Sequence, residues 1–394
     1  MNNNINQIKK SNIFSSDRLY LILVALVAIQ GALNCSAILL PLFAYVKYPI
    51  LLSIIFISMF LFFKQKVKPY ALILLFIFIL LGINSSRIHS SNAVLYIVLL
   101  SYLSKGKNIK ECGKIIFYVI GMEFLLHFIV FLIFFFAHFG NLEVIYQSGV
   151  ARYCMFYDHP NNAAKNYVFL STIIVFLFRE KIKGVHWVLL FGLMVTMYYF
   201  TRSEAILLMF VLFSLSIFNE NIILKRVIDF LTKYGMAIIA VISLCFAYSI
   251  KIPLISKFIL LFDTMGSRRF SDFYRAIQFY GTTFLGQNVT FGKYEVLGGY
   301  NSVYADNLTV YCLTCFGIVY IFVLIILFYI SADRLETNEK IYVLMFIVFG
   351  LIENRVFGIE TFFAIVLAVA SLYNHPKVKK QIKGRKKYRI IQNI

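Results

Sequence analysis

A run of polar residues interrupts an otherwise apolar chain at YDHPNNAAKNY, residues 157–167. Pro160 suits the first position of a helix, because the N–H that proline lacks would have no partner there. Asp158 or His159 would then cap this helix, and Lys165 would lie a turn further in. The N–H groups of a helix N-terminus, an imidazole and a lysine together favour binding of an anion. The alternative is a capped helix whose lysine only extends its charge to the membrane surface.

A second set of candidate residues consists of arginines on connections between apolar runs. Lysine is a general charge anchor, whereas the planar guanidinium binds two phosphate oxygens at once. The set therefore predicts a buried anion, although each arginine could instead pair with a headgroup or with Glu204, Asp272 or Glu353. These arginines are Arg87, Arg152, Arg202, Arg268, Arg269, Arg275 and Arg355.

Two ionisable residues, Glu123 and His127, are one turn apart in an apolar run and therefore share a helix face. A charged side chain at mid-membrane costs about 2.5–3.5 kcal/mol on insertion scales, so both should face the protein interior. Either they relay protons, or they form a mutually satisfied pair in the core. Glu360, in the last apolar run, is expected to pair with a neighbouring helix or with Arg355.

The composition places these residues in a membrane. The chain has 394 residues, of which 61% are hydrophobic and 18% aromatic, and its mean hydropathy is +0.81. A soluble domain is only about half apolar. The net charge of +20 would suggest a nucleic-acid partner in a soluble protein, but these basic residues cluster between apolar runs, which is how topology is encoded. We therefore expect an all-α polytopic membrane protein and exclude nucleic-acid binding.

Apolar runs long enough to cross a bilayer predict about 12 transmembrane helices in a single membrane domain, residues 1–394. Lysine clusters fall on alternate connections, which places these connections and both termini in the cytoplasm. The basic segment 374–394 is then a cytoplasmic tail, and the connections that carry the arginines face the exterior. The runs are 19–41, 44–63, 69–86, 91–104, 115–138, 160–178, 185–201, 203–218, 234–250, 307–330, 340–353 and 356–373.

The longest connection, residues 251–306, lies on the exterior in this topology. Loops of that length are usually functional or have structure of their own. Its segment SRRFSDFYRAIQFYG places Phe270, Phe273 and Ile277 on one helix face and polar residues on the other. We expect a helix that lies in the membrane interface, aromatic face toward the lipid and arginines toward a cavity. Residues 252–262 predict a second interfacial helix or a short re-entrant one.

Four stretches, in this order, resemble motifs of the Wzy-type bacterial polysaccharide polymerases, whose superfamily includes the O-antigen ligases. GVARYCMFYDHPNNAAKNY is similar to their loop-to-helix junction, and YYFTRSEAILLMF to their Thr/Ser-Arg-Ser junction. GSRRFSDFYRAIQFYGTTFLGQ resembles their large outer loop, with Arg275 and Gly286 at a matching spacing. NSVYADNLTVYCLTCFGIVY resembles the exit of that loop. The four stretches cover roughly residues 149–320.

The resemblance implies a polymerase of bacterial surface polysaccharide, O-antigen or capsule, in the cytoplasmic (inner) membrane. Such an enzyme is a glycosyltransferase that acts at the periplasmic or exterior face and needs neither a metal nor another cofactor. Its substrates would be oligosaccharide repeat units linked to undecaprenyl pyrophosphate. A flippase, a chain-length regulator and the membrane lipids would be its partners.

The same resemblance implies site residues. Arg202 and Arg269, with Arg268, would hold the donor pyrophosphate, because preorganised arginines stabilise the charge of the leaving diphosphate. Asp306 stands where the ligases have histidine before asparagine, so either Asp306 or His159 would take the proton of the acceptor hydroxyl. The other residues expected to bind pyrophosphate or glycan are Arg152, Asn161, Lys165, Arg275, Tyr300 and Asn307.

Two other functions stay open. An O-antigen ligase would transfer finished glycan to a different acceptor, but Asp306 in place of histidine and the His-Pro-Asn junction argue against it. A flippase for the same lipid also fits a chain of about 12 spans, yet the sequence has no inverted halves with paired broken helices. The long exterior loop favours an enzyme over a flippase.

Overall fold

The structure is a computed structural model, and the part of the chain that it describes is mostly helical. The described residues are 15–65, 79, 82–83, 92–138, 142–147, 149–218, 220–249, 251–252, 256–257, 269–296, 299–354 and 358–374. The predicted span 69–86 lies outside them except at residues 79, 82 and 83, and the basic tail lies outside them after Asn374.

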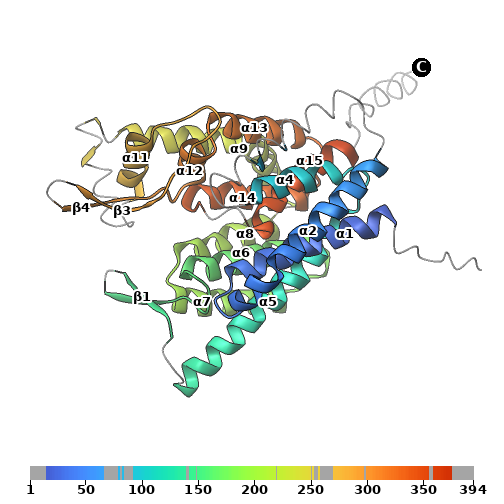
Figure 1. Ribbon diagram of the computed structural model, residues 1–394, viewed down its shortest axis with the longest axis horizontal. Helices are drawn as coiled ribbons and strands as arrows, with labels where there is room; N and C mark the ends of the chain where they lie inside the picture. The colour runs from blue at the N-terminus through green and yellow to red at the C-terminus, as the bar shows by residue number, and fades with distance from the viewer. Residues whose placement is uncertain are drawn as a thin grey trace, which may run out of the picture.

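Helices of very different lengths follow one another along the chain (Figure 1). The first half contains α1 (Ser16–Cys35), α2 (Leu40–Lys64), α4 (Ala93–Leu103), α5 (Ile109–Ala137), α6 (Pro160–Phe178), the 3₁₀ helix η1 (Arg179–Lys181), α7 (Gly184–Thr201), the 3₁₀ helix η2 (Glu204–Leu207) and α8 (Leu208–Ile217). The second half contains α9 (Ile222–Ser249), α11 (Arg269–Tyr280), α12 (Leu308–Cys315), α13 (Ile318–Ser331), α14 (Thr337–Ile352) and α15 (Ile359–Asn374). Two antiparallel hairpins are added to the helices, β1 (Val144–Gln147) with β2 (Val150–Tyr153) and β3 (Gly292–Val296) with β4 (Gly299–Val303).

The central element is α6, whose side chains are almost all buried. It packs against α5, α7, α8, α14 and α15. Figure 1 shows the early helices α1, α2, α5 and α7 in the lower part of the molecule, with α9 and α11 to α15 above them. The core of the protein therefore joins its two halves through α6.

Within the described residues, five helices are long and apolar enough to cross a membrane: α1, α2, α5, α7 and α9. Large apolar side chains on α2 and α7, such as Tyr45, Phe56, Val188 and Leu189, are more than half exposed. An apolar outer surface over an apolar core is consistent with a helical membrane protein. The predicted count of about 12 crossings stays a prediction, because α4, η2 with α8, α13 and α15 are apolar but shorter than a full span.

The bundle has two ends that differ in structure. At the first, here called the terminal end, α1 and α14 begin and α15 ends. There Lys107 Nζ lies 2.8 Å from Asp17 Oδ1, and the N–H of Gly106 donates to Asn374 Oδ1 at 3.0 Å. At the second, here called the hairpin end, α6 begins, α7 and α14 end, and both hairpins lie (Figure 1).

The helix boundaries agree best with the sequence where local signals exist. The predicted span 160–178 is α6 itself, and the predicted span 185–201 differs from α7 by one residue. Near the N-terminus the prediction was wrong, because the run 19–41 ends early as α1 at Cys35. Ser36 stops this helix by pairing with Tyr157 across an isolated bridge, while its Oγ accepts the N–H of Leu39 at 2.9 Å.

The predicted span 307–330 is also wrong as one helix, since it is divided into α12 and α13. At the break Gly317 has φ +88°, a conformation that side chains other than glycine rarely adopt. The loop after α11 docks there, and the N–H of Gln287 donates to the carbonyl of Cys315 at 3.0 Å. A Cβ on Gly286 would lie 2.4 Å from that carbonyl oxygen, so the approach requires glycine.

In the long connection, the predicted helix is present, but its apolar face does not point toward lipid as predicted. Residues Arg269–Tyr280 form α11, but Phe273 and Ile277 pack against Val303 and Val310 of β4 and α12 instead of facing lipid. The β3–β4 hairpin that follows was not predicted, nor was β1–β2. The second expected helix, 252–262, lies outside the described residues except at 252, 256 and 257.

Candidate functional site

The polar stretch of the opening motif forms the start of α6, as its sequence predicts. Pro160 is the first helical residue, and His159 is the N-cap, whose Nδ1 accepts the N–H of Asn161 at 3.1 Å. Because Nδ1 acts as an acceptor, the neutral ring carries its hydrogen on Nε2. His159 can therefore donate a hydrogen bond from Nε2–H, whereas the lone pair of Nδ1 already accepts the N–H of Asn161.

Arg152, on the adjacent β2 strand, connects this junction to α7 and α14. Its Nε donates to the carbonyl of Thr201 at 3.0 Å, and one terminal nitrogen donates to Asn161 Oδ1 at 2.5 Å. The amide nitrogen of Asn161 donates in turn to Glu353 Oε1 at 2.6 Å. A neutral amide thus lies between a cation and a buried carboxylate, and it fixes the position of both.

The segment that contains Asp306 reaches the same place. The side chain of Asn354, next to Glu353, donates to the carbonyl of Ala305 at 2.7 Å. Asn307 caps α12 by accepting the N–H of Val310, and its amide donates to the carbonyl of Leu351 at 2.7 Å. Asp306 itself is half-buried between these two anchored neighbours.

The predicted site residues are therefore only partly brought together. Arg152, His159, Asn161, Asp306 and Asn307 gather around the end of α14. Arg268 lies outside the described residues. Arg269 and Tyr300 are placed by their backbone alone, at the start of α11 and in β4.

Two of the arginines expected to bind an anion have partners at the surface. Arg202 ends α7 with φ +48° and is exposed, with its guanidinium carbon 5.2 Å from the centre of the Tyr199 ring. Arg275 lies 3.3 Å from the carboxylate of Asp272 on its own helix. For Arg275 the structure thus favours the alternative interpretation, an ion pair with Asp272.

Lys165 does not extend to a membrane surface, and its charge is directed into the protein. Its Nζ lies 2.8 Å from Glu360 Oε1 on α15, and the two side chains are only 5% and 4% exposed. The expected pairing of Glu360 with a neighbouring helix is confirmed. The anion site predicted at the start of α6 therefore has no contribution from an exposed lysine.

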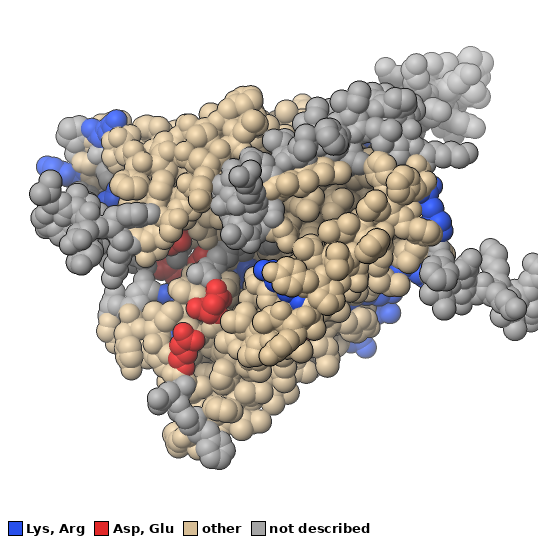
Figure 2. All heavy atoms as spheres, in the orientation of Figure 1, with Lys and Arg blue, Asp and Glu red and all other residues tan. Residues whose placement is uncertain are grey.

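Of the two residues that join these segments, sequence reasoning missed Asn354 and considered Glu353 only as a possible partner of an arginine. Both follow an apolar run as part of the polar sequence ENR, which is the signal that could have identified them. Figure 2 shows Asp and Glu side chains gathered on one face, where the upper and lower parts of the molecule meet and just below, with Lys and Arg side chains nearby. Within the described residues, no group of three or more His, Cys, Asp or Glu is arranged to hold a metal ion.

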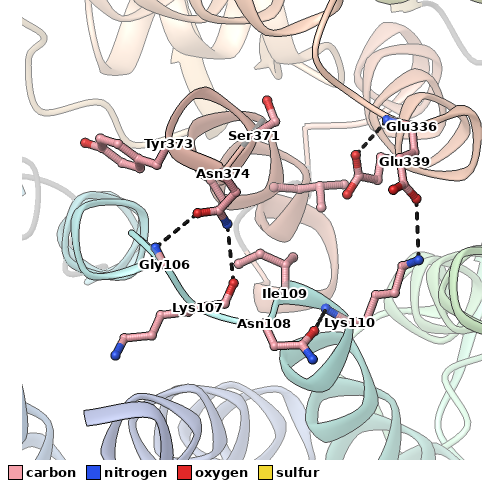
Figure 3. Close-up of a pocket in the computed structure, with 12 residues that line it drawn as sticks. Gly106, Lys107, Asn108, Ile109, Lys110, Glu336, Glu339, Ser371, Tyr373 and Asn374 are labelled. Atoms are coloured by element: carbon pink, nitrogen blue, oxygen red, sulfur yellow. Dashed lines mark hydrogen bonds and ion pairs between the residues drawn. The ribbon is translucent and has the colours of Figure 1, made fainter. Parts of the chain in front are cut away.

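A groove of about 580 Å³ lies at the opposite, terminal end and contains none of the predicted site residues. Its walls are the α4–α5 connection, the start of α14 and the end of α15. Figure 3 shows Asn374 bridging to Gly106 and Lys107, and Lys110 directed toward Glu336.

Comparison of the chain with protein-family models, with curated proteins and with solved structures found no match.

Proposed function

We propose that the protein is a membrane glycosyltransferase that polymerises a bacterial surface polysaccharide. In this proposal a growing glycan is transferred from undecaprenyl pyrophosphate onto a lipid-linked repeat unit at the outer face of the cytoplasmic membrane. The hairpin end of the bundle would face the exterior.

One observation carries the proposal: the four stretches that resemble the polymerases, though distant in sequence, meet at the hairpin end. Arg152 of the first stretch binds Thr201 of the second. Asn161, also of the first, binds Glu353, and the neighbouring Asn354 binds Ala305 of the fourth. The third stretch, as α11, packs on the fourth through the cluster that contains Phe273 and Val303. An active site assembled from separate segments requires this kind of convergence.

The proposed chemistry assigns different tasks to the basic and acidic residues. Arg202 and Arg269, with Arg268, would stabilise the negative charge of the leaving pyrophosphate. Arg152 and Asn161 would position the glycan or the acceptor. Asp306 is favoured over His159 as the general base, because the His159 ring uses its lone pair to cap α6.

Deletion of the gene tests the proposal directly in the bacterium. Loss of a polymerase leaves lipid cores that carry a single repeat unit. Full-length glycan that stays on the lipid carrier would instead indicate a ligase, and repeat units trapped in the cytoplasm would indicate a flippase.

A matched pair of variants tests which residue is the general base. Asp306→Asn should abolish chain extension, whereas His159→Ser, which keeps a capping oxygen, should retain most of it. The measurement is the length distribution of surface glycan at equal membrane abundance of each variant. Normal extension by Asp306→Asn would remove Asp306 as the base.

A second candidate function, lipid flippase, is favoured by one observation. Buried ionisable residues on α5, α6 and α15, namely Glu123, Lys165 and Glu360, lie inside the bundle, as they do in ion-coupled transporters. The deletion phenotype separates the two functions, because only a flippase defect keeps the repeat units inside the cell.

A further inference from the structure

Glu123 and His127 lie inside the bundle on α5, but they do not satisfy one another. His127 Nδ1 is 2.7 Å from the main-chain oxygen of Glu123 and 3.6 Å from its carboxylate Oε1. The shorter contact is the hydrogen bond, because 3.6 Å exceeds hydrogen-bond range. The mutually satisfied pair that the sequence allowed is therefore not formed by their side chains.

The surroundings of His127 favour a neutral ring. The side chain is fully buried, and its Nε2 lies 2.7 Å from Ser36 Oγ. That oxygen accepts the N–H of Leu39, and its own hydrogen can donate to Nε2. Nδ1–H then donates to the carbonyl of Glu123, so both ring nitrogens are used without a positive charge.

Within the described residues, the carboxyl group of Glu123 forms no ion pair with a lysine or an arginine. Its side chain is 3% exposed, and Oε2 accepts the amide N–H of Asn166 at 3.3 Å. Glu123 Oε1 lies beside the hydroxyl of Tyr157, and within the described residues neither atom makes a hydrogen bond of normal geometry. Burial of an ionised carboxylate in this way is strongly unfavourable.

Among the described residues, the cation near this carboxyl is Lys165, which already has an acidic partner. Lys165 on α6 lies 2.8 Å from Glu360 on α15, so these two balance each other. Cys35 of α1 and Asp158 before α6 could add only negative charge. Burial raises the pKa of the Tyr157 phenol well above its ordinary value, so this hydroxyl keeps its hydrogen.

We propose that Glu123 is a proton-binding site inside the bundle, occupied at neutral pH by an exchangeable proton, and that its carboxyl group is hydrogen-bonded to Tyr157. Protonation of Glu123 is compatible with a hydrogen bond that the Tyr157 hydroxyl donates to Oε1, which gives both of these atoms a partner. It also removes the uncompensated negative charge.

Infrared difference spectroscopy of the purified protein in lipid tests this site. Wild type minus Glu123→Gln should show the C=O stretch of one protonated carboxylic acid, and this band should move to lower frequency in D₂O. Glu360→Gln is the matched control, and it should remove carboxylate bands instead. Loss of carboxylate bands in Glu123→Gln would overturn the proposal, because Glu123 would then be ionised.

Two further measurements apply if Glu123→Gln fails to fold. Tyr157→Phe should keep the carboxylic acid band but raise its frequency, and an unchanged frequency would contradict the hydrogen bond. Dicyclohexylcarbodiimide on the wild-type protein should add to the protonated carboxyl, whose oxygen bonds to the carbodiimide carbon while its proton moves to nitrogen. Peptide mass spectrometry should place the adduct on Glu123; an adduct elsewhere, or none, would contradict the proposal.

Discussion

Two ion pairs, one near the hairpin end of the bundle and one at the terminal end, differ in how far they are exposed to solvent. Near the hairpin end, Lys165 and Glu360 form an ion pair whose side chains are 5% and 4% exposed. At the terminal end, Lys110 and Glu336 are 58% and 54% exposed and 3.4 Å apart. Exposed pairs are worth little because water and salt screen them, whereas breaking a buried pair leaves an uncompensated charge. The two ion pairs should therefore differ in their contribution to stability.

The buried ion pair should give the largest effect of any single substitution. Lys165→Met leaves Glu360 uncompensated and should lower the free energy of unfolding by about 3–5 kcal/mol. Thermal or denaturant-induced unfolding of the purified protein in detergent measures the change in free energy. Lys165→Met combined with Glu360→Leu should recover most of the loss, because an apolar replacement of a whole pair is often neutral. If Lys165→Met alone were as stable as the wild type, this result would contradict the comparison of the two ion pairs.

Substitution of Arg152, which bridges the start of α6 and the end of α7, should have the second-largest effect on stability. The guanidinium of Arg152 donates to both Thr201 and Asn161, and the single ammonium group of lysine cannot reproduce this geometry. Arg152→Lys should therefore lower the free energy of unfolding by about 1.5–3 kcal/mol, the value of a charge-assisted hydrogen bond. Arg202→Lys is the control on an exposed arginine. It should change stability by no more than about 0.5 kcal/mol while it reduces chain extension. Equal losses of stability in both variants would show that the hydrogen bonds of Arg152 contribute no more to stability than the contacts of an exposed arginine.

Gly358 tests the same ion pair by steric means. A Cβ at this position would lie 2.0 Å from Glu360 Oε1, so Gly358→Ala should displace the carboxylate from Lys165. The expected cost is about 1–3 kcal/mol, typical of overpacking. Gly192→Ala on α7, where a Cβ meets nothing within 4 Å, is the matched control and should be neutral or slightly stabilising.

The exposed pair at the terminal end should give the smallest effect. A double-mutant cycle of Lys110→Ala and Glu336→Ala should yield a coupling energy of about 0.2–1 kcal/mol. The coupling should shrink as salt is added, since exposed charges are screened. A coupling as large as that of Lys165 with Glu360 would remove the distinction between the two ion pairs.

The sequence predicted α6 well because its signals are local. Pro160 and His159 define the start of the helix, and apolar residues continue to its end. The partners of Asn161 and Lys165 could not be predicted in this way. They are Glu353 and Glu360, on helices far along the chain, and only the packing of α14 and α15 against α6 brings them near.

Two further failures of prediction have the same origin in tertiary contacts. The break between α12 and α13 arises because the loop at Gly286 docks onto Cys315, while hydropathy is continuous across the break. The apolar face of α11 indicated a membrane interface, yet Phe273 and Ile277 found protein partners in β4 and α12. An amphipathic pattern shows that a face is buried and does not identify what covers it.

The central claim, polymerisation at the hairpin end, is tested most directly with the purified protein in liposomes. The substrate is a repeat unit linked to undecaprenyl pyrophosphate, with no other protein and no nucleotide sugar present. Gel or mass analysis of the lipid-linked products should show a ladder that grows by whole repeat units, and Asp306→Asn should abolish it. Unextended substrate that has only moved across the bilayer would contradict the account and identify a transporter.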